Sequence, residues 1–438
     1  MRRSVVRALA AALPVAACAG LLGALAVPAD VEAASPGPGV VGFGQDGYGQ
    51  LGDGASASAP FPVAASGLPR VSAVAAGCYH SLALTADGAV WAWGLNDDGE
   101  LGDGGTARRA LPEPVTGLPG GVVGIAAGCH HSVAVTSSGQ VFAWGEAAQG
   151  QIGDGVNTLS GRLRPVHVAA LDGLQVVRVA AGGQHSAAVT ANGAVYAWGD
   201  NRSGQLGVGD TAGRSAPVLV GGLPAVAGVG LGQGHSLFAG VDHALYAAGL
   251  NDHGQLGDGS TANRVAPVLV GHDVVQASAG DGFSVAAGVS GAVLGWGRAD
   301  AGRLGSGGAA ERHAPAAVPG TGDVIEVAAG GRHVLARTRN GGLITWGDGG
   351  AGQLGDGGQV VRATPAVSAA VQNVTGVAAG EGHSLVLVGV PSAPASVATQ
   401  AATTGIGLPN TSASPGTTVL VAAGALLLAT GISRRRRR

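Results

Sequence analysis

The sequence predicts an all-β protein: a seven-bladed β-propeller of four-stranded blades, one of which is closed by both termini. The first observation is a phrase, Gly-Gln-Leu-Gly-Asp-Gly or a near copy, that occurs seven times at intervals of 48 to 54 residues. The second is the alternation of apolar residues in short segments between the phrases, without a helical pattern. Such a period indicates an array of equal β units closed into a propeller. The Gln-Leu pair of the phrase, or its equivalent, begins at residues 50, 100, 151, 205, 255, 303 and 353.

One repeat, followed in order, accounts for the four strands of a blade. Residues 71–77 are a run of small apolar residues typical of a first strand, and residues 80–85 alternate as a second. An Asp-Gly pair then favours a hairpin turn, because Gly adopts positive φ without strain. Residues 89–94 alternate again as a third strand. A short fourth strand is expected near residues 114–115, after the loop that carries the phrase.

The two ends of the array predict how the ring closes. Residues 40–44 match the third strand of a repeat, and residues 377–387 match the first and second strands before the pattern stops. These half-units sum to one blade, so that six whole blades and one divided blade make seven. A blade shared by both ends latches the ring and leaves no free sheet edge at the closure.

These motifs resemble the repeats of the regulator of chromosome condensation family. The resemblance rests on a run of the type Ala-Ala-Gly-x-x-His-Ser-Leu-Ala-Leu, an Asp-Gly turn, a strand ending in Trp-Gly and the Gly-Gln-Leu-Gly turn, and it covers residues 40–390. It implies a seven-bladed propeller. The wider group includes bacterial secreted β-lactamase-inhibitor proteins with the same fold.

The segments outside the repeats predict export. Residues 1–33 have a basic start, an apolar run and a small-residue cleavage site, which together are typical of a secretory signal peptide. Residues 34–39 form a short linker to the propeller of residues 40–390. A Ser/Thr/Ala/Pro spacer follows at residues 391–416, and residues 417–438 hold an apolar segment and five terminal Arg residues.

The C-terminal segment resembles a Gram-positive cell-wall sorting signal. Its Leu-Pro-Asn-Thr-Ser sequence ends at Thr411 and Ser412. The family pattern has Gly in the place of Ser412. The resemblance implies that a sortase cuts between these two residues and joins the protein to the wall. The alternative is a membrane anchor held by the terminal Arg residues. Both alternatives place the propeller outside the cell, at the wall or on the outer face of the plasma membrane.

Composition bounds the source and the partners. All 24 basic residues are Arg, which together with 82 Gly residues and abundant Ala suggests a GC-rich, actinobacterial genome. The net charge is −3; residues 1–33 contribute +1 and the terminal Arg run +5, which leaves −9 for the rest. An acidic, exported body is a poor partner for a polyanion, so we expect no nucleic-acid binding.

Some residues recur at one position of nearly every repeat, which favours a structural role. We expect the recurrent His and Trp to pack and hydrogen-bond between blades rather than to ligate metal, since Phe283 takes the His position in one repeat. The Asp that ends the phrase is expected to form turns rather than to bind calcium. These residues are His80, His131, His185, His235, His333, His383, Trp93, Trp144, Trp198, Trp296, Trp346, Asp53, Asp103, Asp154, Asp258 and Asp356.

No motif in the sequence indicates an enzyme. The chain contains no Gly-x-Ser-x-Gly elbow, no His-Glu-x-x-His zinc motif and no phosphate loop. We therefore expect no catalytic residue, no cofactor and no metal site, with a catalytic site in the propeller mouth as the open alternative.

Two cysteines occupy equivalent positions in adjacent repeats. Cys78 and Cys129 each follow the glycine that ends a predicted first strand. An exported protein permits a disulfide between them. Spacing does not show whether their Cα atoms approach closely enough, so bonded and free cysteines both stay open.

Function is expected where the repeats differ. Two positions vary between the fixed Gly and His of each repeat and are expected to ring one mouth of the channel; a second variable set precedes the phrase. Loops on a rigid scaffold are common binding sites, although the same variation fits loops that merely face solvent. The candidate binding residues are Tyr79, His130, Gln184, Arg202, His253, Asp281, Arg298, Arg332 and Glu381.

These observations favour a surface-displayed, monomeric propeller that binds an extracellular or cell-surface protein, or a wall component, through the loops of one face. The alternative implied by the resemblance is an inhibitor-like binder of a β-lactamase or a penicillin-binding protein. A rim with few aromatics beyond Tyr48 and Tyr79 favours it less. Guanine-nucleotide exchange on a small GTPase is implied by family analogy alone and conflicts with export, since such GTPases are cytosolic.

Overall fold

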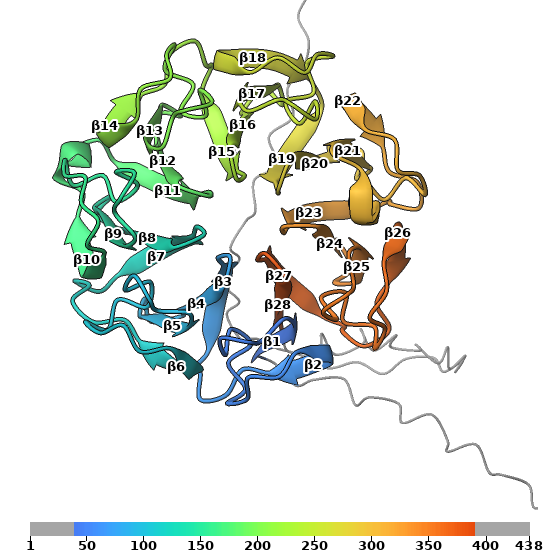
Figure 1. The fold of residues 1–438 in the computed structure, drawn as a ribbon, viewed down its shortest axis with the longest axis horizontal. Helices are drawn as coiled ribbons and strands as arrows, with labels where there is room; N and C mark the ends of the chain where they lie inside the picture. The colour runs from blue at the N-terminus through green and yellow to red at the C-terminus, as the bar shows by residue number, and fades with distance from the viewer. Residues whose placement is uncertain (1–38, 390–438) are drawn as a thin grey trace, which may run out of the picture. The chain divides into compact units, whose positions relative to one another are not determined.

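The computed structural model describes residues 39–389, which form a ring of seven four-stranded antiparallel sheets around a central axis (Figure 1). Within these residues the only helices are two short 3₁₀ turns, η1 (Ala169–Leu171) and η2 (Asp300–Gly302). The prediction of an all-β, seven-bladed propeller with four-stranded blades is confirmed.

The blades are numbered from 1, the divided blade, to 7, with the strands of each given from the axis outward. Blade 1 contains β27 (Val374–Ala379), β28 (His383–Val388), β1 (Gly39–Gly44) and β2 (Ala59–Ala64). Blades 2 to 4 contain β3 (Val71–Ala76), β4 (His80–Thr85), β5 (Val90–Gly94), β6 (Arg109–Pro114); β7 (Val122–Ala127), β8 (His131–Thr136), β9 (Val141–Gly145), β10 (Arg162–His167); β11 (Val176–Ala181), β12 (His185–Thr190), β13 (Val195–Gly199) and β14 (Arg214–Leu219). Blades 5 to 7 contain β15 (Val226–Leu231), β16 (His235–Gly240), β17 (Leu245–Gly249), β18 (Arg264–Gly271); β19 (Val274–Ala279), β20 (Phe283–Gly288), β21 (Val293–Gly297), β22 (Arg312–Ala317); β23 (Val324–Ala329), β24 (His333–Thr338), β25 (Leu343–Gly347) and β26 (Arg362–Val367).

The divided blade closes as expected. β1 pairs antiparallel with β28 along its whole length, from Gly39 opposite Val388 to Gly44 opposite His383. β28 pairs in turn with β27, so the start of the chain supplies the third and fourth strands and its end supplies the first and second. The two ends of the array are thereby held by a full ladder of backbone hydrogen bonds.

Position within the blade decides which side chains each strand carries. The innermost strands are rich in Ala, Gly and Val, because seven strands converge on the axis and leave little room for larger side chains. The fourth strand of blade 2, predicted near residues 114–115, ends there at Pro114 but is longer than expected, since it begins at Arg109. The reason is that Arg109 pairs opposite Gly94 and donates to the phrase residue Asp103, which holds the start of the strand in place.

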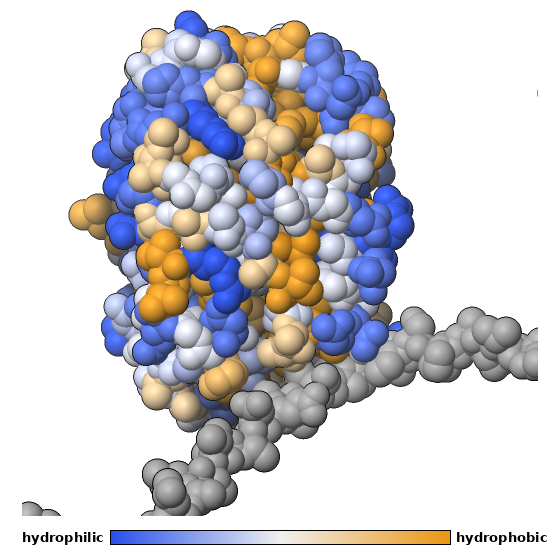
Figure 2. Space-filling model, turned by 90° about the vertical axis from the view of Figure 1, so that its right-hand side faces the viewer, coloured by the Kyte–Doolittle hydropathy of each residue, from blue (hydrophilic) through white to orange (hydrophobic). Residues whose placement is uncertain are grey.

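The antiparallel order sorts the loops onto two faces. Loops between first and second strands and between third and fourth strands open on one face, which we call the mouth face. Hairpins between second and third strands and the connections between blades open on the opposite face. The rim between the faces is a mixture of apolar and polar patches (Figure 2). Single apolar side chains such as Phe61 and Leu219 are exposed on its outer strands.

The recurrent histidines and serines tie each blade to the next. At six of the seven junctions a His Nε2 lies 2.8–3.1 Å from a Ser Oγ of the following blade, as between His80 and Ser132. The Ser132 hydroxyl donates onward to the backbone carbonyl of Glu100, so it must accept from the imidazole, which therefore carries its proton on Nε2. Trp144 Nε1 donates to the same carbonyl. The predicted packing and bonding of recurrent His and Trp between blades is confirmed.

The six histidines and their serine partners form a buried set that we call the belt. The belt histidines are neutral. Burial lowers the pKa to about 4 in His80, His185 and His333 and to about 3 in the other three. The glycine that ends each first strand makes room for the ring: a Cβ on Gly77 would collide with His80 and with the carbonyl of Gly128.

Several predicted features lie outside the described residues and remain predictions. They are the signal peptide (1–33), most of the linker (34–38), the spacer (391–416), the sorting site at Thr411 and Ser412 and the anchor (417–438). In the part of the chain that the structure describes, no helix is long and apolar enough to cross a membrane.

Candidate binding face at the propeller mouth

The structure places all nine predicted binding residues on the mouth face. Six lie in loops between first and second strands: Tyr79, His130, Gln184, Asp281, Arg332 and Glu381. Arg202, His253 and Arg298 lie in loops between third and fourth strands. All nine are partly or fully exposed. The repeat pattern therefore located them on a common face, while their neighbours depend on the geometry of the blade junctions.

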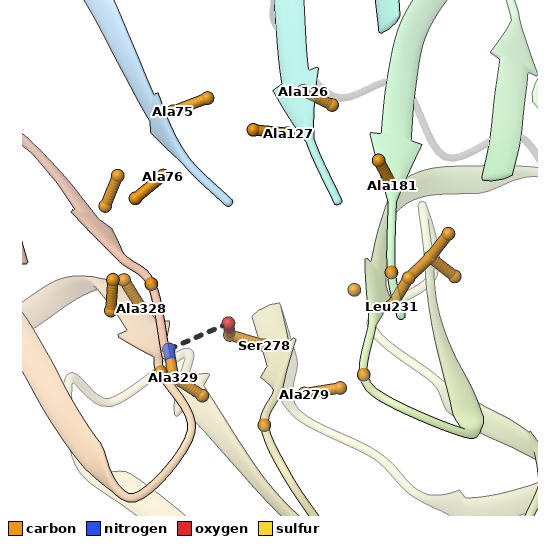
Figure 3. A pocket seen from close by; sticks show the side chains of 18 of the residues that line it. Ala75, Ala76, Ala126, Ala127, Ala181, Leu231, Ser278, Ala279, Ala328 and Ala329 are labelled. Carbon is orange, nitrogen blue, oxygen red and sulfur yellow. Dashed lines mark hydrogen bonds between the residues drawn. The ribbon is translucent and has the colours of Figure 1, made fainter. Parts of the chain in front are cut away.

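The axial channel opens in the middle of this face. Small side chains of the innermost strands line it, as Figure 3 shows for Ala75, Ala127, Ala181 and Ala329. Its volume is about 360 Å³, the lower end of the range for small-molecule sites. Gln276, Ser278 and Glu326 add polar side chains along the innermost strands. At the mouth, the first of the two variable residues in each repeat lines the opening: Cys78, Cys129, Gly183, Gln233, Asp281, Gly331 and Glu381.

The second variable residue of each repeat lies on the mouth face but outside the lining of the channel. Tyr79, His130, Gln184 and Arg332 are the candidates at this position. Backbone hydrogen bonds explain the division. Cys129 N–H donates to Gly182 O of the next blade, which holds the first residue at the axis. His130 O accepts from Glu146 N–H of its own blade's outer loop, which turns the second residue outward.

Cys78 and Cys129 form a disulfide that joins blades 2 and 3 at the channel mouth. Their Cα atoms are 4.3 Å apart, because the ends of adjacent innermost strands converge on the axis. Gln233 of blade 5 places its Nε2 3.0 Å from Cys129 Sγ and 3.5 Å from Cys78 Sγ. The bonded alternative is thus the one the structure shows.

Side chains from blades 1 to 3 stack into an aromatic patch, which consists of Tyr48, Tyr79, Arg108 and His130. The rings of Tyr48 and Tyr79 meet edge to face with their centroids 5.3 Å apart, and the His130 ring is 6.1 Å beyond Tyr79. The Arg108 guanidinium lies 4.6 Å from the centre of the Tyr48 ring and also pairs with Asp97 at 2.9 Å.

A buried carboxylate lies beside this patch. Glu100 occupies the phrase position that is Gln in five other blades, and its side chain is 0% exposed. His130 Nδ1 is 3.2 Å from Glu100 Oε1. Burial opposes ionisation of Glu100, but the hydrogen bond from His130 and the backbone N–H of Asp98, which donates to Oε2 at 2.9 Å, favour the carboxylate and hold the pKa of the carboxyl below its usual value. The same hydrogen bond raises the pKa of His130. The two groups therefore form an ion pair.

Blade 6 carries a different charged centre. Arg303 takes the phrase position of Gln and is 0% exposed at its side chain. Its Nη1 donates to the carbonyl of Asp281 at 2.6 Å and its Nη2 pairs with Asp300 at 3.1 Å. Arg298 also pairs with Asp300, at 2.8 Å. Burial lowers the pKa of Arg303 below its ordinary, very high value, which leaves it a cation held under the rim.

The remaining candidates make local contacts. Arg202 pairs with Asp200 at 2.9 Å and donates to Gln184 at 3.2 Å, beside a groove of about 440 Å³ over blades 3 to 5. His253 Nδ1 lies 2.7 Å from Glu311. These contacts hold long side chains in place on the rim.

The His–Ser contacts of the belt resemble the base and nucleophile of a catalytic site but cannot act as such a pair. In catalytic pairs the base and the nucleophile lie at a similar distance from each other as His Nε2 and Ser Oγ do here. Here His80 and Ser132 are both 0% exposed, and the hydroxyl proton of Ser132 points to the Glu100 carbonyl instead of to the imidazole. A substrate cannot reach this pair, and its serine is already a donor.

Sequence reasoning placed Tyr48 at the rim but missed three residues that shape the face. Arg108 completes the aromatic patch, while the buried charges of the face are Glu100 and Arg303. The signal for the last two was visible, since each departs from Gln at a position fixed in the other five blades. A residue that departs from the repeat at a buried position is a stronger indication of a site on this face than variation in an exposed loop is.

The fold and this face define a closed repeat propeller whose recurrent residues bind blade to blade and whose differing residues gather at one mouth. The chain belongs to the family described as RCC1-like domain, whose model matches residues 39–386. Among curated relatives, it is 35% identical over 183 residues to the ultraviolet-B receptor UVR8 of Arabidopsis thaliana, which is 41% of either chain. It is 37% identical over 199 residues to the human E3 ubiquitin-protein ligase HERC2, 44% of this chain and 4% of that one. The chain spans less than half the length of these curated relatives.

Solved structures show the same architecture. Human WBSCR16 superposes with a TM-score of 0.74 at 27% identity, over 82% of this chain and all of that one. Prp20p of Saccharomyces cerevisiae, whose structure was described with its binding to Gsp1p and histones, superposes with a TM-score of 0.70 at 25% identity, over 80% of this chain and 91% of that one.

Proposed function

We propose that this protein is an exported, surface-attached, non-catalytic module that binds a protein, or a wall component, through its mouth face. The observation that carries the proposal is the division of residues between two places. Residues shared by the blades are buried in the belt, whereas all nine candidates that differ between blades lie exposed on one face. A structural relative, yeast Prp20p, binds the proteins Gsp1p and histones, which supports protein recognition by this fold.

The aromatic patch is the best anchor for a partner. Tyr and Arg dominate the energetics of protein interfaces because they bury large, fairly rigid surfaces with a polar end. Tyr79 and Arg108 offer both within blade 2, and Tyr48 of blade 1 fixes them by edge-to-face and cation–π contact. In blade 7, next to blade 1, Arg332 is exposed and free to meet an acidic group of the partner.

Binding is tested by capture on the immobilised chain from the secreted and wall fractions of its source. We expect one saturable partner, retained by the parent chain and lost with Tyr79→Ala combined with Arg332→Ala. Arg339→Ala is the matched control, because Arg339 is an arginine that is 70% exposed on the opposite face. The substitutions should change the free energy of unfolding by no more than about 0.5 kcal/mol. Equal capture by all three proteins would contradict the proposal.

Surface attachment is tested separately. Removing residues 408–438 should move the propeller from the cell-envelope fraction to the medium, since this segment contains the sorting sequence and the apolar run. Substituting Thr411 alone should block wall attachment and leave the protein with the membrane, because the sortase attacks the Thr carbonyl. A propeller that stays in the envelope after the deletion would show that attachment depends on other residues.

Inhibition of a β-lactamase or a penicillin-binding protein is the second candidate function. The stacked pair of Tyr48 and Tyr79 favours it, because two rigid aromatic side chains at one point of the rim can fill a pocket of an enzyme. The test is residual activity of a panel of such enzymes with excess chain present. Inhibition abolished by Tyr79→Ala would make this the function, and undiminished activity throughout would remove the candidate.

A further inference from the structure

The mouth face contains a cluster of metal-ligand groups beside the aromatic patch. Asp98, Glu100 and His130 present two carboxylate oxygens and an imidazole nitrogen that all lie within 4.8 Å of one another. Glu100 is fully buried beneath the cluster, whereas Asp98 and His130 are 40% and 34% exposed. The cluster is therefore anchored at its base and open to solvent at its top.

The cluster carries more negative charge than its neighbours neutralise. Glu146 Oε1 accepts from Gln184 Nε2 at 3.5 Å, whereas its Oε2 is a buried atom without a hydrogen-bond partner among the described residues. Glu146 also interacts electrostatically with Asp98, Glu100 and His130, so the three carboxylates carry more negative charge than His130 neutralises even when it is protonated. The adjacent Arg108 does not compensate, because it pairs with Asp97 at 2.9 Å.

We propose that Asp98, Glu100 and His130 form a binding site for a divalent transition-metal cation such as Zn²⁺, with Glu146 as an additional ligand. Two positive charges would satisfy the excess of carboxylates and give the orphaned Glu146 oxygen a partner. An imidazole nitrogen among carboxylate oxygens suits Zn²⁺ and its first-row neighbours. Ca²⁺ and Mg²⁺ favour oxygen ligands alone, so they should bind more weakly here.

The site lies within the proposed binding face, because His130 also belongs to the aromatic patch, but binding of the cation does not require the partner. The ligands come from two blades: Asp98 and Glu100 from the outer loop of blade 2, and His130 and Glu146 from blade 3. A bound cation would cross-link blades 2 and 3, which the Cys78–Cys129 disulfide also joins. The exposed top of the site leaves coordination positions for water or for an anionic group of a partner.

The experiment is calorimetric titration of the purified, chelator-treated chain with ZnCl₂ near neutral pH, with Co²⁺ absorption as a spectroscopic readout of nitrogen ligation. We expect one equivalent to bind with micromolar or tighter affinity. Glu100→Gln and His130→Gln should each weaken binding by at least about tenfold. Both variants should fold, because Gln is the native residue at the equivalent positions of other blades, as in Gln151 and Gln184.

The matched control is His253→Gln. His253 is also a partly exposed histidine, with Nδ1 2.7 Å from Glu311, but it lacks the buried carboxylate beneath it. This variant should bind Zn²⁺ like the parent chain. Millimolar binding only, or affinity unchanged by both Glu100→Gln and His130→Gln, would overturn the proposal and leave a simple ion pair between His130 and Glu100. Loss of the cation with intact partner capture would keep the site and separate it from the proposed function.

Discussion

Two kinds of blade junction hold this ring together. At six junctions an imidazole donates to a serine of the next blade. At the seventh, between blades 6 and 7, Phe283 and Val334 occupy the same two positions and lie buried in one apolar cluster. The polar pair and the apolar pair fill equivalent places. The difference shows that the pair, and not either residue alone, is the unit that the junction requires.

A change of one partner alone would leave a buried polar group without a hydrogen bond, which costs about 1–3 kcal/mol. Changing both avoids that cost. The apolar junction also accommodates Arg303, whose guanidinium lies 5.5 Å from the centre of the Phe283 ring. The charged centre of blade 6 on the mouth face therefore lies against a junction in which Phe283 and Val334 replace the His and Ser of the belt.

Acid should break the six polar junctions first, and this is the largest effect we expect. The unfolded pKa of His is about 6.5, and the folded values are about 3 to 4. The unfolded chain therefore binds protons first as the pH falls. Stability is complete above pH of about 6.5 and is lost toward pH 4, by up to about 1.4 kcal/mol per pH unit for each histidine.

The measurement is urea unfolding across this pH range. A variant with His131→Phe and Ser186→Val copies the apolar junction into blades 3 and 4, and its pH dependence should be shallower by up to one proton. A free energy of unfolding that stays constant between neutral pH and pH of about 4 would contradict the neutral state of the belt.

Trp198→Ala should produce the largest loss from a single substitution. The indole is 0% exposed and packs against residues of the preceding blade, and its Nε1 donates to Gln151 O at 2.8 Å. Truncating a buried Trp costs about 3–5 kcal/mol, measurable by urea unfolding. Trp198→Phe is the control and should cost less, because blade 1 natively carries Phe43 at this position. Equal losses for Ala and Phe would show that packing does not dominate.

A double-mutant cycle at the apolar junction tests the pair directly. Phe283→His alone should cost about 1–3 kcal/mol, because the imidazole would face the methyl groups of Val334 without an acceptor. Adding Val334→Ser should recover part of the loss, with a coupling energy of about 0.5–3 kcal/mol. The Arg303→Gln background removes the cation from beside the new histidine. Strictly additive losses would mean that the two positions act independently.

The sequence predicted what repetition encodes. Six whole blades and one divided blade, the structural role of the recurrent His and Trp, and the common face of the variable loops all follow from register alone. Contacts between different repeats did not follow from it. The ion pair of Glu100 with His130 joins loops of two blades, and the disulfide depends on how closely innermost strands converge at the axis. Repeat position specifies a residue's place in its blade, whereas junction geometry specifies its partner.

The Asp46 site is the converse of the apolar junction. Here Asp46 replaces the Asn of other blades, while the groups around it stay as they are in the repeat. The equivalent Asn96 accepts from Leu101 N–H and donates through Nδ2 to the carbonyls of Gly105 and Ala107. Asp46 is 0% exposed and accepts from Leu51 N–H in the same way, but its Oδ2 is a buried atom with no hydrogen-bond partner. Burial raises the pKa of Asp46 to about 6, despite the backbone hydrogen bond.

Asp46→Asn should therefore stabilise the propeller, by about 1 kcal/mol at neutral pH. The folded carboxyl has a pKa above its unfolded value of 3.8, so the unfolded state releases the proton first as the pH rises, and the penalty is complete above pH 6. The gain should shrink toward pH of about 4, where the protonated Asp can donate as Asn does. The measurement is the difference in unfolding free energy between the two proteins at each pH, which cancels the effect of the histidines. A gain that persisted unchanged in acid would come from a source other than the missing donor, and the contrast between paired and unpaired replacements would fail.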